Sequence, residues 1–159
     1  MSITTALPTS FKKELATKTH DLGDASSSPI GGDVFKLALI AAGAAGTYGA
    51  ASTNYSELND SSPIEEATDS NSPQGYSAGG GTLTNNGVTI SGTTAYVDFA
   101  DITFSSVDLS ADGAIIYNSS ASNEIIYVGD FGSTKTASGG DFVIQFPTAD
   151  ASNAIIRLA

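Results

Sequence analysis

The chain of 159 residues has no cysteine and no tryptophan, and it has one histidine. Without cysteine it can form no disulfide framework, no thiolate zinc site and no cysteine nucleophile. Its stability must therefore come from packing or assembly. The N-terminal stretch "MSITTALPTSFKKELATK" places its lysine pair after the apolar residues and contains no apolar core of a secretion signal. We expect a protein made in a cytoplasm without processing.

Basic residues are scarce: six Lys and Arg stand against 17 Asp and Glu, for a formal net charge of −11. Direct nucleic-acid binding needs a basic stripe that displaces counterions from phosphates, so we expect no nucleic-acid partner. The most continuous apolar run, "VFKLALIAAGAAG", is shorter than the roughly 20 residues of a membrane span. Lys36 and Gly43 also interrupt it, so we expect no membrane partner.

Charged residues make up 14% of the chain, below the roughly 25% of average soluble domains, and hydrophobic residues make up 40%. Small and neutral-polar residues fill the difference, which is typical of an all-β extracellular or assembled protein. The length fits a single domain with one core.

The first half of the sequence divides into four parts. "SFKKELATKT", residues 10–19, predicts a short helix capped by Ser10, and a linker of Gly, Ser, Pro and Asp follows it. We therefore treat residues 1–32 as an N-terminal arm. Residues 33–42 alternate apolar and β-branched positions and predict a first strand. Residues 43–81 are mostly small and polar, and they predict a long loop.

From residue 82 onward, short strands alternate with turn signals, which predicts an all-β fold: one β-sandwich or jelly-roll-like domain over residues 33–159. The parity of the apolar residues changes at Ala100-Asp101, which indicates a bulge or a tight connection. The runs "AIIY", "EIIYV" and "AIIRLA" are apolar on consecutive residues and predict central strands with both faces covered. The expected turns are Asn86-Gly87, Asp112-Gly113, the Ser-Ala-Ser-Asn before Glu124, Ser138-Gly139-Gly140 and "PTADASN".

One parity of each strand must face inward, and this rule selects the expected core. The residues so selected are Phe35, Leu37, Leu39, Val97, Phe99, Ile102, Phe104, Ile115, Ile126, Val128, Phe142, Ile144 and Phe146.

Catalytic and metal-binding patterns are incomplete in this sequence. His20, the sole histidine, lies in "THDLGD" without a nucleophile, and we interpret it as a solvated loop residue. "DLSADG", residues 108–113, resembles the first half of an EF-hand loop, but Ser119 stands where a bidentate Glu is required. The sequence therefore predicts no enzyme, no cofactor and no metal site. The remaining acidic cluster is interpreted as a solvated loop: Glu57, Asp60, Glu65, Glu66 and Asp69.

The order of several segments resembles a family of small β-rich virion structural proteins of tailed bacteriophages. The segments that carry the resemblance are "FKKELATKTHDLG", "DVFKLALI", Gly75–Asn85, Tyr96–Ser106, Gly113–Asn118, Gly129–Pro147 and the final "NAIIRLA". They span nearly the whole chain. The resemblance implies a protein without cofactors or catalytic residues that is located in the virion.

Within that family, the resemblance implies a head decoration (cement) protein bound to the capsid shell, or a tail, collar or fibre-attachment accessory protein. A carbohydrate-binding β-sandwich is the alternative from another class. The expected partners are the major capsid protein or other virion proteins, and further copies of this chain in a symmetric oligomer. Interface candidates come from the predicted helix and from the long loop: Phe11, Lys12, Lys13, Leu15, Tyr48, Tyr55, Leu58 and Tyr76.

Overall fold

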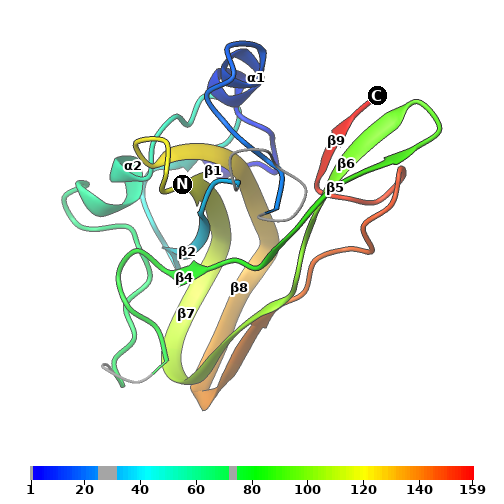
Figure 1. Ribbon diagram of the computed structural model, residues 1–159. Helices are drawn as coiled ribbons and strands as arrows, with labels where there is room; N and C mark the ends of the chain where they lie inside the picture. Colours follow the sequence, from blue (N-terminus) through cyan, green and yellow to red (C-terminus); the bar gives the residue numbers. More distant parts are fainter. Residues whose placement is uncertain (1, 25–31, 72–74) are drawn as a thin grey trace.

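The computed structural model describes residues 2–24, 32–71 and 75–159, and strands are its main secondary structure. Three sheets are present in these residues: a four-stranded sheet β4-β2-β7-β8, a three-stranded sheet β5-β6-β9, and a two-stranded sheet β1-β3 (Figure 1). Pairing is antiparallel throughout the two larger sheets and parallel between β1 and β3. The predicted all-β class is confirmed.

The elements have the following bounds. The strands are β1 (Ser2–Ile3), β2 (Phe35–Ala41), β3 (Thr47–Tyr48), β4 (Gly81–Thr82), β5 (Asn85–Ser91), β6 (Thr94–Phe99), β7 (Ile102–Asn118), β8 (Glu124–Ile144) and β9 (Ile156–Leu158). The helices are α1 (Thr9–Ala16) and α2 (Ser56–Asn59).

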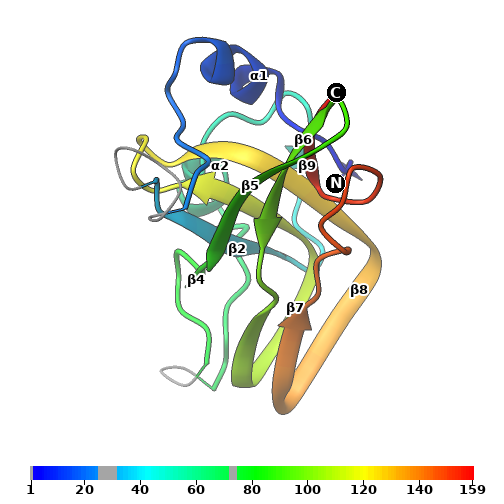
Figure 2. The ribbon, with the colours of Figure 1, turned by 45° about the vertical axis from the view of Figure 1, so that its right-hand side comes forward.

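A long hairpin of β7 and β8 forms the frame of the molecule, with the predicted Ser-Ala-Ser-Asn turn between its strands. The turns predicted at Asp112-Gly113 and at Ser138–Gly140 are wrong, because the first lies inside β7 and the second lies inside β8. Pairing shifts register at both places, so these residues form bulges. In Figure 2 the hairpin turns back on itself at the bottom of the molecule. Gly139, in the bulge on β8, has a positive φ of 68°.

Gly87, in another predicted turn, also forms a bulge. The hairpin turn predicted at Asn86-Gly87 is wrong: Gly87, with φ of 91°, lies within β5 at a register shift. The β5–β6 turn follows at Gly92 and Thr93, where Gly92 supplies the positive φ. The connection predicted at Ala100-Asp101 is confirmed, since β6 ends just before it and β7 begins just after it.

Both faces of the four-stranded sheet are covered. On β2, Phe35, Leu37 and Leu39 face a large cluster that includes residues of the three-stranded sheet, such as Val97 and Ile156. The alternate residues of β2 face a second cluster, which the loop after β2 and the N-terminal strand close. Its members are Ala38, Ile40, Ala44, Tyr48, Leu58, Ile115, Tyr117, Ile125 and Val128, with Ile3 and Tyr55 partly buried against them.

The predicted core is confirmed, because all thirteen residues are buried except Ile102, Ile144 and Phe146, which are partly buried and pack against the large cluster. The prediction for "AIIRLA" is wrong. Its strand β9 pairs with β6 alone in the described residues and forms a sheet edge, and Leu158 is 49% exposed.

The N-terminal residues belong to the same folded body, which corrects the separate arm assigned to residues 1–32. Strand β1 pairs with β3, Ala6 pairs with Val128, and Phe11 of α1 is fully buried in the large cluster. The predicted helix is confirmed, although it begins at Thr9 and no side chain caps it. Residues 25–31 of the linker lie outside the described residues.

The segment from Gly43 to Gly81 also folds within the chain, as far as it is described. Backbone hydrogen bonds of 2.8–2.9 Å join its residues Glu65 and Ala67 to β2, at Ala41 and Leu39. The long loop predicted for residues 43–81 is therefore docked on the sheet of its own chain. Among its large residues, Tyr48, Tyr55 and Leu58 pack in the second cluster, whereas Tyr76 packs in the large cluster.

Leu39→Ala and Ile40→Ala test whether both faces are covered. These adjacent residues are each fully buried but point to opposite clusters. We expect each substitution to lower the free energy of unfolding by about 2–5 kcal/mol in urea titrations. Ile64→Ala, at a position 61% exposed, serves as the control and should change it by less than about 0.5 kcal/mol. A small effect of Ile40→Ala alone would show that the loop does not cover its face.

Candidate interaction surfaces

Four of the eight predicted interface residues are not available for an interface. Phe11, Tyr48, Leu58 and Tyr76 are each at most 2% exposed and pack inside the chain. Their wide spacing in the sequence suggested exposure, but the loop and the helix dock on the sheet and bury them. We correct their assignment from interface to core.

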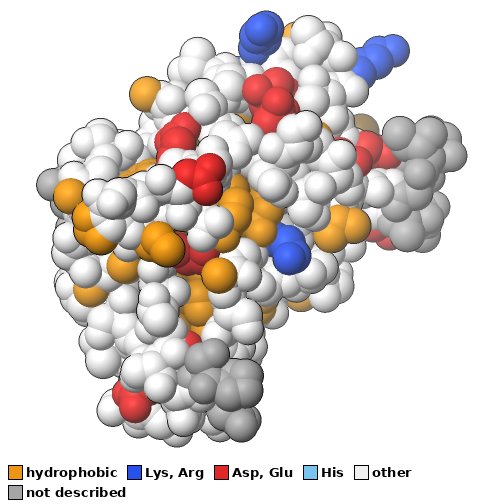
Figure 3. Space-filling model, turned by 90° about the vertical axis from the view of Figure 1, so that its left-hand side faces the viewer, with side chains coloured by type: hydrophobic (Ala, Val, Ile, Leu, Met, Phe, Trp, Pro, Cys, Tyr) orange, Lys and Arg blue, Asp and Glu red, His pale blue; other side chains and the backbone are white. Residues whose placement is uncertain are grey.

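The other candidates keep some exposure. Lys12 and Lys13 are exposed, whereas Leu15 and Tyr55 are partly buried. Together with the exposed Lys18, the two lysines form what we call the cationic helix surface, which holds three of the six basic residues of the chain. In Figure 3 basic side chains project at the top of the molecule, over α1. Within the described residues these lysines form no ion pair.

The carboxylate of Glu66 is the centre of a buried polar cluster that the sequence did not predict. Its Oε1 accepts hydrogen bonds from the Tyr76 hydroxyl and the Gly79 N–H, both at 2.8 Å, and its Oε2 accepts one from the Tyr55 hydroxyl at 2.6 Å. The Tyr76 oxygen in turn accepts the N–H of Leu39 at 2.9 Å. Glu66 is 3% exposed, so these donors take the place of water.

Two further carboxylates of the loop are buried in the same manner. Glu65 accepts the Tyr48 hydroxyl and the N–H groups of Ala45 and Gly46, and these bonds hold the pKa of its carboxyl below the usual value. The N–H of Asp108 is the main cause that lowers the pKa of Asp69. The interpretation of these acidic residues as a solvated loop is wrong for Glu65, Glu66 and Asp69.

The tyrosines of the cluster are affected in the opposite direction. Burial, followed by hydrogen bonding to the carboxylates, raises the pKa of Tyr48 and Tyr55, and burial also raises that of Tyr76. Tyr117 stacks on Tyr55 with ring centroids 4.6 Å apart and donates to the Gly79 carbonyl at 2.7 Å. Burial raises its pKa to about 12. A signal for this cluster existed in the sequence: residues 43–81 contain no basic residue, so buried carboxylates there need hydroxyl and backbone donors.

His20 is buried, so its interpretation as a solvated loop residue is wrong. Its Nε2 lies 2.9 Å from Glu14 and 3.9 Å from Glu124, which brings three possible metal ligands together. The orientation of Asn118 opposes a metal, however. The Asn118 oxygen accepts the N–H of Ser120, which leaves its amino group to donate to the His20 Nδ1 at 2.9 Å.

This geometry fixes the proton of the imidazole. Because Nδ1 accepts from Asn118, the neutral ring carries its proton on Nε2 and donates it to Glu14. Nε2 then has no lone pair for a metal ion. The Asn118 amino group also lies 2.6 Å from Asp33. The result is a hydrogen-bond chain that fastens α1 and the residues after it to the end of β7.

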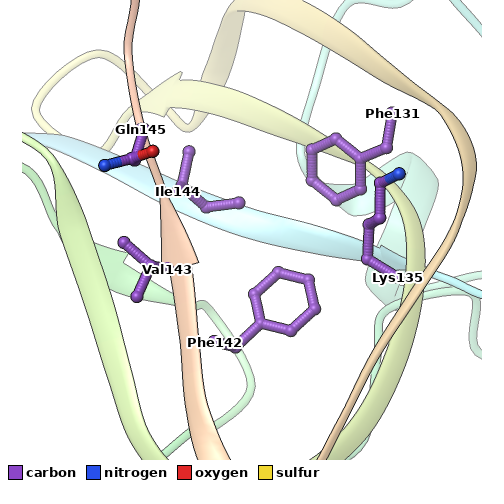
Figure 4. Close-up of a pocket in the computed structure, with 6 residues that line it drawn as sticks. All are labelled: Phe131, Lys135, Phe142, Val143, Ile144 and Gln145. Carbon is purple, nitrogen blue, oxygen red and sulfur yellow. The ribbon is translucent and has the colours of Figure 1, made fainter.

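An open hollow of about 350 Å³ lies along β8. Figure 4 shows the rings of Phe131 and Phe142 and the side chain of Ile144 around this space, with Lys135 beside Phe131. The middle of β8 and its C-terminal end both contribute, so the hollow is a product of the fold-back of the β7–β8 hairpin. Its wall is mostly apolar, and Lys135 contributes an ammonium group at its side.

The three-stranded sheet extends away from the body, as its β5–β6 hairpin shows at the right of Figure 1. Register places Val88 opposite Val97, and Ile90 and Leu158 opposite Ala95, so all five side chains share one face. Val97 is buried, but Val88, Ile90 and Leu158 are 41%, 75% and 49% exposed. We call this uncovered end, Val88, Ile90, Ala95 and Leu158, the open sheet face.

Comparisons with protein-family models, with curated proteins and with solved structures give no match to this chain. None of the described helices is long and apolar enough to cross a membrane.

Glu66→Ala tests the buried polar cluster. The change leaves the hydroxyls of Tyr55 and Tyr76 and one backbone N–H without their acceptor, so we expect a loss of roughly 3–5 kcal/mol in the free energy of unfolding. Asp60→Ala removes an exposed carboxylate from the same loop and should cost less than about 0.5 kcal/mol. Equal, small effects in urea titrations would contradict the role given to Glu66.

The cluster also predicts how stability depends on pH. The pKa values of Glu65 and Asp69 are lowered in the folded chain. Their contribution to stability is therefore fully present above pH 4.5 for Glu65 and above pH 3.8 for Asp69, and it is lost as the pH falls further. The pKa values of the tyrosines are raised, so their contribution to stability is present below pH 10.0 and is lost as the pH rises. For Tyr117 the loss occurs as the pH passes through its pKa of about 12. Glu65→Gln should flatten the acid limb of unfolding free energy against pH. Asp60→Asn should leave it unchanged.

Proposed function

We propose that this chain is a structural protein of a tailed-bacteriophage virion that decorates the capsid shell. The order of segments that resembles the virion family supports the class of protein. The observation that carries the proposal is the cationic helix surface: half of the basic residues of a chain with net charge −11 stand on α1 and the turn just after it. Such a concentration of one charge marks the surface that meets an acidic partner.

The way α1 is held favours this function. Phe11 anchors the helix in the large cluster, and the His20–Glu14 hydrogen bond of 2.9 Å ties the helix to the residues that follow it. Lys12 and Lys13 therefore project from a fixed position rather than from a loose arm. A preorganised contact loses less conformational entropy on binding than a disordered one does.

The arrangement of strands supports a β-sandwich of jelly-roll type as the finer description of the fold. The three-stranded sheet contributes Val97, Phe99 and Ile156 to the cluster on one face of the four-stranded sheet, and the folded-back end of the β7–β8 hairpin adds Phe104 and Phe142. We propose that such a module acts in a symmetric oligomer on the virion surface, without a cofactor and without catalysis.

A tail, collar or fibre-attachment protein is the alternative within the virion class, and copy number separates the two. A decoration protein should approach the copy number of the major capsid protein in a gel of purified virions, whereas a tail accessory protein should be far rarer. Absence of the protein from purified virions would overturn both. A glycan array tests the carbohydrate-binding alternative, for which the hollow beside Phe131 is the surface to examine.

Lys13→Glu tests the cationic helix surface. The exposed side chain lies in the last turn of α1, so the variant should still fold and should lose no more than about 1 kcal/mol of unfolding free energy. We expect association with virions that lack the protein to slow by about tenfold at low salt and by less at high salt, because exposed charges are screened. Lys135→Glu makes the same charge change on β8 and is the control. Equal slowing by both variants would show that net charge, not the helix, decides binding.

A further inference from the structure

We propose that the open edge of β5 pairs with β5 of a second copy of this chain, in an antiparallel dimer around a two-fold axis at Thr89. This inference deepens the oligomer in the proposed function by naming its surface. It does not depend on the virion role, because it concerns the protein in solution.

The open sheet face is the first support. Its side chains belong to a row that runs along one face of the three-stranded sheet. The other end of this row, at Val97 and Ile156, is buried in the core. At the outer end no part of the described chain covers Ile90, which is 75% exposed. Exposed apolar side chains on an edge strand mark a contact site in a folded protein.

The edge itself is the second support. Natural edge strands carry charges, prolines or bulges that prevent pairing. From Val88 to Ser91, β5 has none of these, since its bulge lies earlier, at Gly87. All four residues are exposed.

Charge selects β5 over the other edge of this sheet. Strand β9 contains Arg157, so pairing β9 with its own copy would bring two like charges together. Strand β5 has no charged residue, so two β5 edges can meet without this cost. Among the described strands of more than three residues, β5 alone carries no charged residue, and this favours a second copy as the occupant.

The register follows from the pairing of β5 with β6. Ser91 and Thr94 flank a two-residue turn and form a hydrogen-bonded pair. Because hydrogen-bonded and non-hydrogen-bonded pairs alternate along an antiparallel ladder, Thr89 also bonds to β6. The backbone N–H and C=O groups of Val88 and Ile90 therefore point to the open edge. An axis at Thr89 then pairs Val88 of one copy with Ile90 of the other. This register keeps both apolar residues on one face, whereas a shift by one residue would place apolar beside polar.

The absence of cysteine permits a direct test. In the proposed dimer Thr89 faces its own copy in a non-hydrogen-bonded pair, with Cα atoms about 4.5 Å apart, which is within disulfide range. Thr89→Cys should therefore give a covalent dimer under mild oxidation. Thr103→Cys, exposed on β7 away from the β5 edge, is the matched control and should give no covalent dimer. No cross-linking of Thr89→Cys, or equal cross-linking of both variants, would overturn the proposal.

Sedimentation equilibrium gives an independent measurement. Ile90→Asp should raise the dissociation constant of the dimer by at least about tenfold, because the charge appears twice beside the axis. Ile64→Asp, exposed on the loop, should not change it. A parent chain that is monomeric at all concentrations would overturn the dimer but leave the decoration function intact if the protein is found on virions. If the chain dimerises but is absent from virions, the decoration function is overturned and the dimer stands.

Discussion

The hydrogen bonds to the Glu66 carboxylate are the interaction on which the rest of the structure depends. They gather Tyr55, Tyr76 and Gly79 around one acceptor, and Tyr76 passes the connection on to the backbone of β2 at Leu39. The loop that these bonds fix is the cover for the second cluster. Without it, one face of the four-stranded sheet would expose Ile40 and its neighbours to water.

This constraint explains how a cysteine-free chain orders a long polar loop. Small residues alone cannot offset the conformational entropy lost on ordering. Buried charge-assisted hydrogen bonds are stronger than neutral ones, and three carboxylates supply them here. Because Glu65 and Asp69 take backbone N–H groups as partners, the same bonds that satisfy the charges also set the path of the chain. Acidic residues thus do in this loop what a disulfide does in many small secreted domains.

Local pattern predicted much of the fold, and the errors share one cause. Alternation identified the strand at Phe35, the core and the all-β class, because inward parity is a property of each strand alone. Gly87 and Gly139 were assigned to turns, although both lie in bulges. A positive φ serves either purpose, and only the partner strand decides between them. The burial of His20 could not be predicted either, since Asn118 is 98 residues away along the chain.

The candidate surfaces were the least predictable part, because exposure depends on what docks elsewhere. Val97 and Ile90 lie on the same face of the three-stranded sheet and are both aliphatic. Val97 is buried and Ile90 is exposed, because the core ends partway along the sheet. Net charge then limits where contact can form. An acidic surface repels copies of itself and acidic partners, so association is favoured only where that field is reversed, at the lysines of α1, or locally absent, along β5. The acidic composition, which by itself names no partner, thereby restricts which parts of the surface can have one.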